Sequence, residues 1–86
     1  MLHALKTIQP YFDAVKTGNK TFELRKYDRP FTPSDTLVLQ EWDNKEGKYT
    51  GQELTFTISY VLADVVEYGL KKGYCILGLK EKPSYD

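Results

Sequence analysis

The sequence predicts a mainly β (α+β) domain, a small open β-barrel of about five short strands with one short helix covering one end. The chain has 86 residues, which leaves room for a single domain over residues 1–86. Several segments alternate apolar and polar side chains with the period of a half-buried strand, whereas a single short segment has helical spacing. A curled sheet with a helix over its opening buries such faces most economically.

The N-terminal third predicts a strand, a helix and a second strand. Residues 1–8 are apolar enough for a strand. Residues 10–17 begin with a proline, whose fixed backbone angle suits the first turn of a helix, and Gly18 follows as a residue that ends helices. Residues 20–26 alternate between an apolar and a polar face, which is the period of a strand with one buried side.

The rest of the chain predicts a hairpin and a closing strand. Residues 28–35 contain two prolines and several turn formers, which is typical of an ordered surface loop. A strand, a polar connection and a second strand follow as a hairpin, and the second of these strands points its apolar face inward, Tyr60 included. After a mixed stretch come a last strand and a tail that we expect to be frayed. In chain order these segments are residues 36–42, 43–51, 52–60, 61–72, 74–80 and 81–86.

The charge pattern favours binding of an anionic ligand at one local site over nonspecific binding of polyanions. Twelve Lys and Arg balance twelve Asp and Glu, so no overall field attracts the chain to nucleic acid or to an anionic membrane. The charge is uneven, because residues 1–29 carry a net charge of +3 and residues 35–67 a net charge of −5. Any anionic ligand must therefore be bound by a local group of cations.

The single cysteine and the single histidine argue against metal and redox sites. Cys75 has no disulfide partner and stands in an apolar run, which predicts a buried packing residue in a reducing, cytoplasmic compartment. His3 alone cannot form a zinc site. No apolar run approaches the roughly 18 residues of a membrane span, and the N-terminus lacks a secretory signal pattern. We therefore expect no cofactor, no metal and no membrane partner.

Directly after the predicted helix the sequence reads Gly-Asn-Lys-Thr-Phe-Glu-Leu-Arg, starting at Gly18. With Lys20, Glu23 and Arg25, this segment matches a G-x-K-x-x-E-x-R signature and resembles the ASCH domain (activating signal cointegrator homology), a relative of the PUA-like RNA-binding barrels. The motif follows a short helix and enters a strand, as it does in that family. Residues 69–78 resemble the closing strand of short bacterial and phage members, and the resemblance covers roughly residues 5–79. The resemblance implies a PUA-like barrel and an RNA or nucleotide-like ligand.

The chemistry of these residues is consistent with a ligand cleft. Strict alternation puts Lys20 opposite Glu23, so their cooperation requires Lys20 to lie before the regular strand or beside a bulge. A Glu between cations should be held as a carboxylate by charge-assisted hydrogen bonds, and it should position Arg25 as much as contact a ligand. The competing interpretation is a solvated strand face without a ligand.

Cations and aromatic rings near the motif are what a single-stranded nucleic acid requires, because phosphates bind Lys and Arg and bases stack on aromatic faces. The further candidate ligand-binding residues are Lys26, Tyr27, Arg29 and Trp42. Alternatives remain open for three of them. Trp42 could pack in the core or at the rim, Tyr27 could cap the barrel, and Arg29 could pair with Asp28 in a local turn.

Three functions fit these observations. The first is noncatalytic binding of a short or modified RNA or of a nucleoside-sized ligand. The second is an enzyme, since ASCH relatives include amidohydrolases of acetylated cytidine and proteins described as ribonucleases. Where the amidohydrolases have a nucleophilic Thr, this chain has Glu23, and Thr21 is two residues away, so any catalysis would fall to Lys20 and Glu23 and is disfavoured. The third is an accessory domain that binds a protein partner through a strand edge or a tyrosine-rich face.

Overall fold

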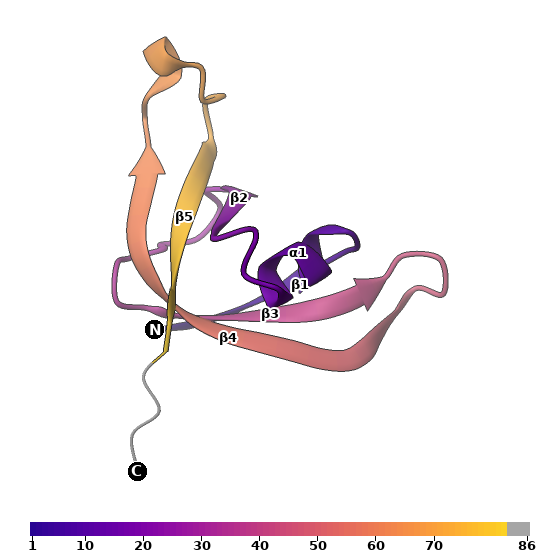
Figure 1. The fold of residues 1–86 in the computed structure, drawn as a ribbon. Coiled ribbons are helices and arrows are strands. Elements are labelled where there is room, and N and C mark those ends of the chain that lie inside the picture. The colour runs from indigo at the N-terminus through magenta and orange to yellow at the C-terminus, as the bar shows by residue number, and fades with distance from the viewer. Residues whose placement is uncertain (83–86) are drawn as a thin grey trace.

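Five strands form one sheet that curls into a half-barrel, with a short α-helix on its concave side (Figure 1). The computed structural model describes residues 1–82. No helix in that range is long and apolar enough to cross a membrane. The elements in chain order are β1 (Leu2–Thr7), α1 (Tyr11–Lys16), β2 (Phe22–Lys26), β3 (Thr36–Asp43), β4 (Lys48–Ala63), a 3-10 helix η1 (Val66–Tyr68) and β5 (Tyr74–Glu81).

The predicted class, mainly β with a small open barrel and one helix, is confirmed. The strand order is β1-β3-β4-β5-β2, in which β1 and β3 are parallel and every other pair is antiparallel. The long strand β4 pairs with β3 along its first half and with β5 along its second half, and it bends between them (Figure 1). The sheet consequently remains open between its two edge strands, β1 and β2.

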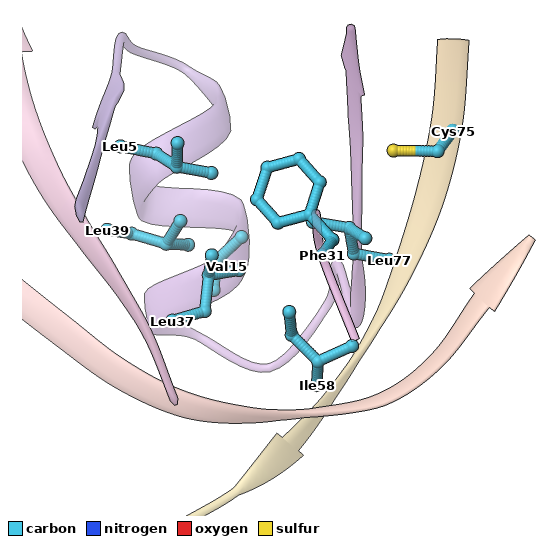
Figure 2. Close-up of a cluster of buried hydrophobic side chains, with 8 residues drawn as sticks. All are labelled: Leu5, Val15, Phe31, Leu37, Leu39, Ile58, Cys75 and Leu77. Carbon is cyan, nitrogen blue, oxygen red and sulfur yellow. The ribbon is translucent and has the colours of Figure 1, made fainter. Parts of the chain in front are cut away.

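The core lies on the concave face, between the sheet and α1 (Figure 2). Alternate residues of each strand point inward, as the period of two requires. Val15 of α1 packs against the leucines of β1 and β3, and Phe31, from the loop after β2, fills the space toward β5. Cys75 is fully buried, as predicted, and burial raises the pKa of its thiol. The cluster consists of Leu5, Val15, Phe31, Leu37, Leu39, Ile58, Cys75 and Leu77.

The β3–β4 hairpin confirms the predicted pairing but has a shorter connection. β3 continues to Asp43 and β4 already begins at Lys48, so the predicted polar connection over residues 43–51 is wrong at both ends. The Asp43 carboxylate accepts hydrogen bonds from the backbone N–H groups of Lys45 and Glu46, which close the turn and lower the pKa of Asp43. A side chain that satisfies the turn's own N–H groups allows the ladder to continue almost to the tip.

Two further predictions about the strands need correction. Tyr60 does not point inward, because a register shift between Ile58 and Tyr60 breaks the alternation and leaves its side chain exposed. The tail predicted over residues 81–86 is wrong at its first residue, since Glu81 still pairs with Phe56 of β4. Residues 83–86 lie outside the described part of the chain.

Candidate functional site

The polar face of β2 is the buried face. Glu23 is 3% exposed, whereas the apolar Phe22 and Leu24 on the other face are 46% and 55% exposed. This reverses the usual pattern of a half-buried strand, in which the apolar face is covered. A carboxylate is stable in such a position only when it is paired and hydrogen-bonded, and its partners are therefore the centre of the site.

Lys20 and Arg25 are those partners. Lys20 Nζ donates to Glu23 Oε1 at 2.6 Å, and Arg25 Nε donates to Glu23 Oε2 at 3.0 Å. The Lys20 side chain reaches Glu23 because the residue precedes β2, which was the condition for their cooperation. The predicted trio is thus brought together by adjacent chain segments.

Local backbone geometry fixes the position of Lys20. Gly18 has φ +84°, the left-handed conformation that glycine adopts most readily, and its N–H donates to the Val15 carbonyl at the end of α1. The N–H of Lys20 then donates to the Ala14 carbonyl at 2.9 Å. The first residue of the motif therefore ends the helix and aims the second toward β2, as predicted for Gly18.

Arg25 also crosses the open side of the half-barrel. Its Nη2 donates to the Lys6 carbonyl at 2.6 Å and to Thr7 Oγ1 at 3.2 Å, both in β1. Arg25 Nη1 and two of the three Lys20 ammonium hydrogens have no hydrogen-bond acceptor within residues 1–82. Since both Glu23 oxygens are occupied, the site presents hydrogen-bond donors and positive charge to a ligand.

These donors lie in a surface depression of about 680 Å³ between β1, α1 and β2. Two of its walls are aromatic, and the Lys20 ammonium lies 5.1 Å from the ring centroid of Phe22 and 5.9 Å from that of Tyr11. The lining residues are Lys6, Thr7, Ile8, Tyr11, Lys20, Phe22, Glu23, Leu24 and Arg25. Apolar walls beside donor groups suit a planar ring that carries acceptor atoms or negative charge.

The other predicted ligand residues lie outside this depression. Tyr27 donates its hydroxyl to the Phe31 carbonyl at 3.2 Å, a contact within the loop that follows β2. Asp28 Oδ1 lies 3.8 Å from Arg29 Nε, which agrees with the local ion pair. Lys26 and Arg29 line a separate concavity that shares Arg25 with the first.

Trp42 packs at the rim of the sheet. Its ring meets that of Tyr49 edge to face, with 4.9 Å between centroids, and the Lys6 ammonium lies 3.8 Å from the Trp42 centroid. The sequence interpretation missed Lys6, Thr7 and Tyr11. No local sequence pattern marks a lysine at the end of a strand, or a tyrosine on a helix, as a ligand-binding residue. Whether these side chains line the depression depends on how β1 lies across from β2.

A second buried carboxylate, Glu41, also escaped the sequence interpretation. It accepts hydrogen bonds from Gln9 Nε2 at 2.5 Å, Thr50 Oγ1 at 2.7 Å and Gln52 Nε2 at 3.0 Å. Lys16 of α1 donates to Gln52 Oε1 at 2.8 Å. This network joins the start and the end of the helix to β3 and β4, so we assign it to holding the helix on the sheet.

His3 has a structural role with Asp35. Its Nε2 lies 2.8 Å from Asp35 Oδ2, which also accepts from the N–H of Thr32, and the N-terminal ammonium of Met1 donates to Oδ1 at 3.0 Å. The hydrogen bond from His3, followed by that from the terminal ammonium, lowers the pKa of Asp35. Within residues 1–82, no three His, Cys, Asp or Glu side chains are grouped as metal ligands would be.

The chain is similar in sequence to a protein family and to a phage protein. The model of a family described as "Domain of unknown function (DUF3850)" matches residues 2–79. The chain is also similar to the "Uncharacterized 12.9 kDa protein in GpA 3'region" of Escherichia phage P2, with 40% identity over 68 residues. The aligned segment covers 77% of this chain and 61% of the phage protein, so the chain spans less than two thirds of that relative.

Proposed function

Since this chain belongs to the DUF3850 family, whose description names no activity, we propose a function from the site itself: noncatalytic binding of RNA or of a nucleotide-like ligand in the depression around Lys20, Glu23 and Arg25. We also propose that the domain is a divergent ASCH-type, PUA-like module that works in the cytoplasm. The placement of the G-x-K-x-x-E-x-R residues supports that relationship, because Gly18 ends the helix and both cations of the motif pair with its Glu.

One observation carries the proposal: two cations converge on a buried carboxylate at the floor of an apolar-walled depression. Glu23 holds Lys20 and Arg25 in fixed positions, which reduces the entropy that a ligand must remove from long side chains. Acceptor atoms of a base, ribose or phosphate can take the remaining donors, while the ring lies against Tyr11 or Phe22. Stacking of one base contributes about 1 to 3 kcal/mol in comparable sites.

Binding fits these contacts better than amide hydrolysis does. Each oxygen of Glu23 accepts a hydrogen bond from a cation, so the carboxylate is arranged to position Lys20 and Arg25 and not to orient an attacking water. Thr21 lines a different depression from the one that contains Glu23. We therefore expect the protein to leave acetylated cytidine intact, and steady release of acetate that is lost in Glu23→Gln would contradict the proposal.

The proposal is tested by titrating short single-stranded RNA and uridine monophosphate into the protein at 20 and 200 mM salt. Lys20→Met and Arg25→Gln should each weaken binding at least tenfold, because each removes a floor donor. Lys45→Met removes an equal charge from the exposed β3–β4 turn and should leave affinity within twofold of the unmodified protein. Circular dichroism of every variant checks that the fold persists. Absence of binding at low salt, or equal affinities for all three variants, would refute the proposed function.

A further inference from the structure

A second concavity, of about 460 Å³, adjoins the ligand depression and concentrates positive charge. Four cations line it, Lys6, Arg25, Lys26 and Arg29, against the single acid Asp28. The chain as a whole has no net charge, so the local excess of positive charge in this concavity cannot be seen from the composition. A positive potential confined to one hollow attracts a multivalent anion to that hollow without causing nonspecific anion binding over the whole surface.

The cations of this concavity have unused binding capacity. The ammonium groups of Lys6 and Lys26 donate to no acceptor within residues 1–82. Arg29 is 3.8 Å from Asp28 and both side chains are exposed, so this pair neutralises little charge in water. Lys6 is held over the Trp42 ring at 3.8 Å, which fixes its ammonium at the edge of the hollow.

The two hollows share part of their walls. Lys6 and Arg25 line both of them, and the Arg25 guanidinium spans the opening from β2 to the Lys6 carbonyl of β1. A ligand that touches Arg25 from the depression is thus within reach of the second hollow. The depression has apolar walls for a ring, and the second hollow has cations for phosphates, with Tyr49 exposed on its rim.

We propose that the ligand is a single-stranded oligonucleotide of at least two nucleotides, with a base in the depression and its phosphodiester backbone crossing Arg25 into the hollow of Lys6, Lys26 and Arg29. This inference rests on the proposed function and adds to it the class and minimum length of the ligand. An acidic peptide fits less well, because it offers charge to the second hollow but no planar ring to the first. A long duplex fits less well because it needs a wide basic surface, whereas the four cations of the second hollow line one small concavity.

Salt dependence gives the inference a quantitative form. For single strands, the slope of log K against log salt is about −0.7 for each phosphate that is neutralised. Two phosphates bound in the second hollow give a slope of roughly −1.4, and one bound phosphate gives about half of that. The Lys26→Gln/Arg29→Gln double variant should shift the slope toward the value for one phosphate.

The experiment is a length series, namely uridine, uridine monophosphate, UpU and a uridine tetranucleotide, with deoxyribo counterparts, titrated at 20 to 200 mM salt. Affinity should rise at least tenfold from the monophosphate to the tetranucleotide. The ratio of those two affinities should fall toward one in Lys26→Gln/Arg29→Gln. A matched double variant, Lys45→Gln/Lys80→Gln, removes the same charge from exposed positions outside both hollows and should retain the full ratio.

The outcomes separate this inference from the proposed function. Binding of uridine or its monophosphate with no gain in longer ligands would overturn the inference and leave the proposed function intact. No binding of any member of the series would overturn both. A gain with length in either the ribo or the deoxyribo series supports the inference and identifies the preferred sugar. A tetraglutamate peptide that binds as tightly as the tetranucleotide would overturn it, because charge alone would then suffice.

Discussion

Replacing Glu23 by Gln tests how far the buried carboxylate supports the fold. Gln has nearly the same shape and keeps one carbonyl oxygen, but its NH2 group takes the place of the second carboxylate oxygen. Only one of the two cations then retains an acceptor, and the other faces a donor. The Glu23 side chain is 4% exposed, so water cannot take the place of the missing carboxylate oxygen as a hydrogen-bond acceptor.

The expected cost follows from the burial of the three groups. Breaking a fully buried ion pair by removing one partner costs about 3 to 5 kcal/mol. The Lys20 and Arg25 side chains are 18% and 25% exposed, so water recovers part of that energy. We expect Glu23→Gln to lower the free energy of unfolding by about 2 to 4 kcal/mol. For a domain of this size, that loss corresponds to a melting temperature lower by roughly 10 to 30 °C.

Urea unfolding followed by circular dichroism and by Trp42 fluorescence measures this loss. Glu53→Gln is the matched control, because Glu53 is exposed and accepts one hydrogen bond, from Gln40 at 2.9 Å. That change should stay within about 0.5 kcal/mol of the unmodified protein. A Glu23→Gln variant as stable as Glu53→Gln would refute the reasoning, since the carboxylate would then have no net stabilising role.

Four further outcomes are expected. The buried Cys75 thiol, whose pKa is raised by burial, should react with a thiol reagent at pH 8 only in urea, and rapid labelling of the native protein would contradict its burial. The lowered pKa of Asp35 means that its carboxylate stabilises the fold at neutral pH and that this contribution is lost as the pH falls from about 4 through the lowered pKa. Asp35→Asn should therefore flatten the acid dependence of the urea midpoint, and an unchanged profile would disprove the link. Leu39→Ala, at a fully buried site, should cost about 2 to 5 kcal/mol in the same urea assay. Gly18→Ala forces φ +84° on a residue with a side chain and should cost about 1 kcal/mol although nothing crowds the position, so a neutral effect would argue against that backbone conformation.

Local patterns were sufficient for the order of the strands and the helix, although not for the bounds of the β3–β4 hairpin. The strands, the single helix and the β3–β4 hairpin follow from alternation, from Pro10 and from Gly18, because each signal lies within a few residues of the element that it describes. The meeting of Lys20 with Glu23 was predicted only on a condition, because strict alternation puts the two residues on opposite faces. The structure meets that condition, since Lys20 precedes the regular strand β2. Tyr60 was predicted wrongly because a single bulge in β4 reverses every later side chain.

Long-range packing determined the rest and left little trace in the sequence. The parallel pairing of β1 with β3 joins Leu2 to Thr36, and no neighbouring residue announces it. The buried side of β2 carries Glu23 because β1 and Lys20 supply its surroundings, whereas the alternation alone favours burying Leu24. The hydrogen bonds around Glu41 likewise need the helix and two strands in place before the carboxylate has any partner.

The reach of Arg25 across the open side of the sheet also affects what the β1 edge offers to another chain. Unpaired rims of sheets invite strands from other molecules, and proteins commonly deter that addition with charged side chains. Here the Lys6 carbonyl already accepts a hydrogen bond from the Arg25 guanidinium, and an incoming strand would need that carbonyl as an acceptor. Arg25, which the proposed function places against the ligand, thus also makes the β1 edge less available to an added strand.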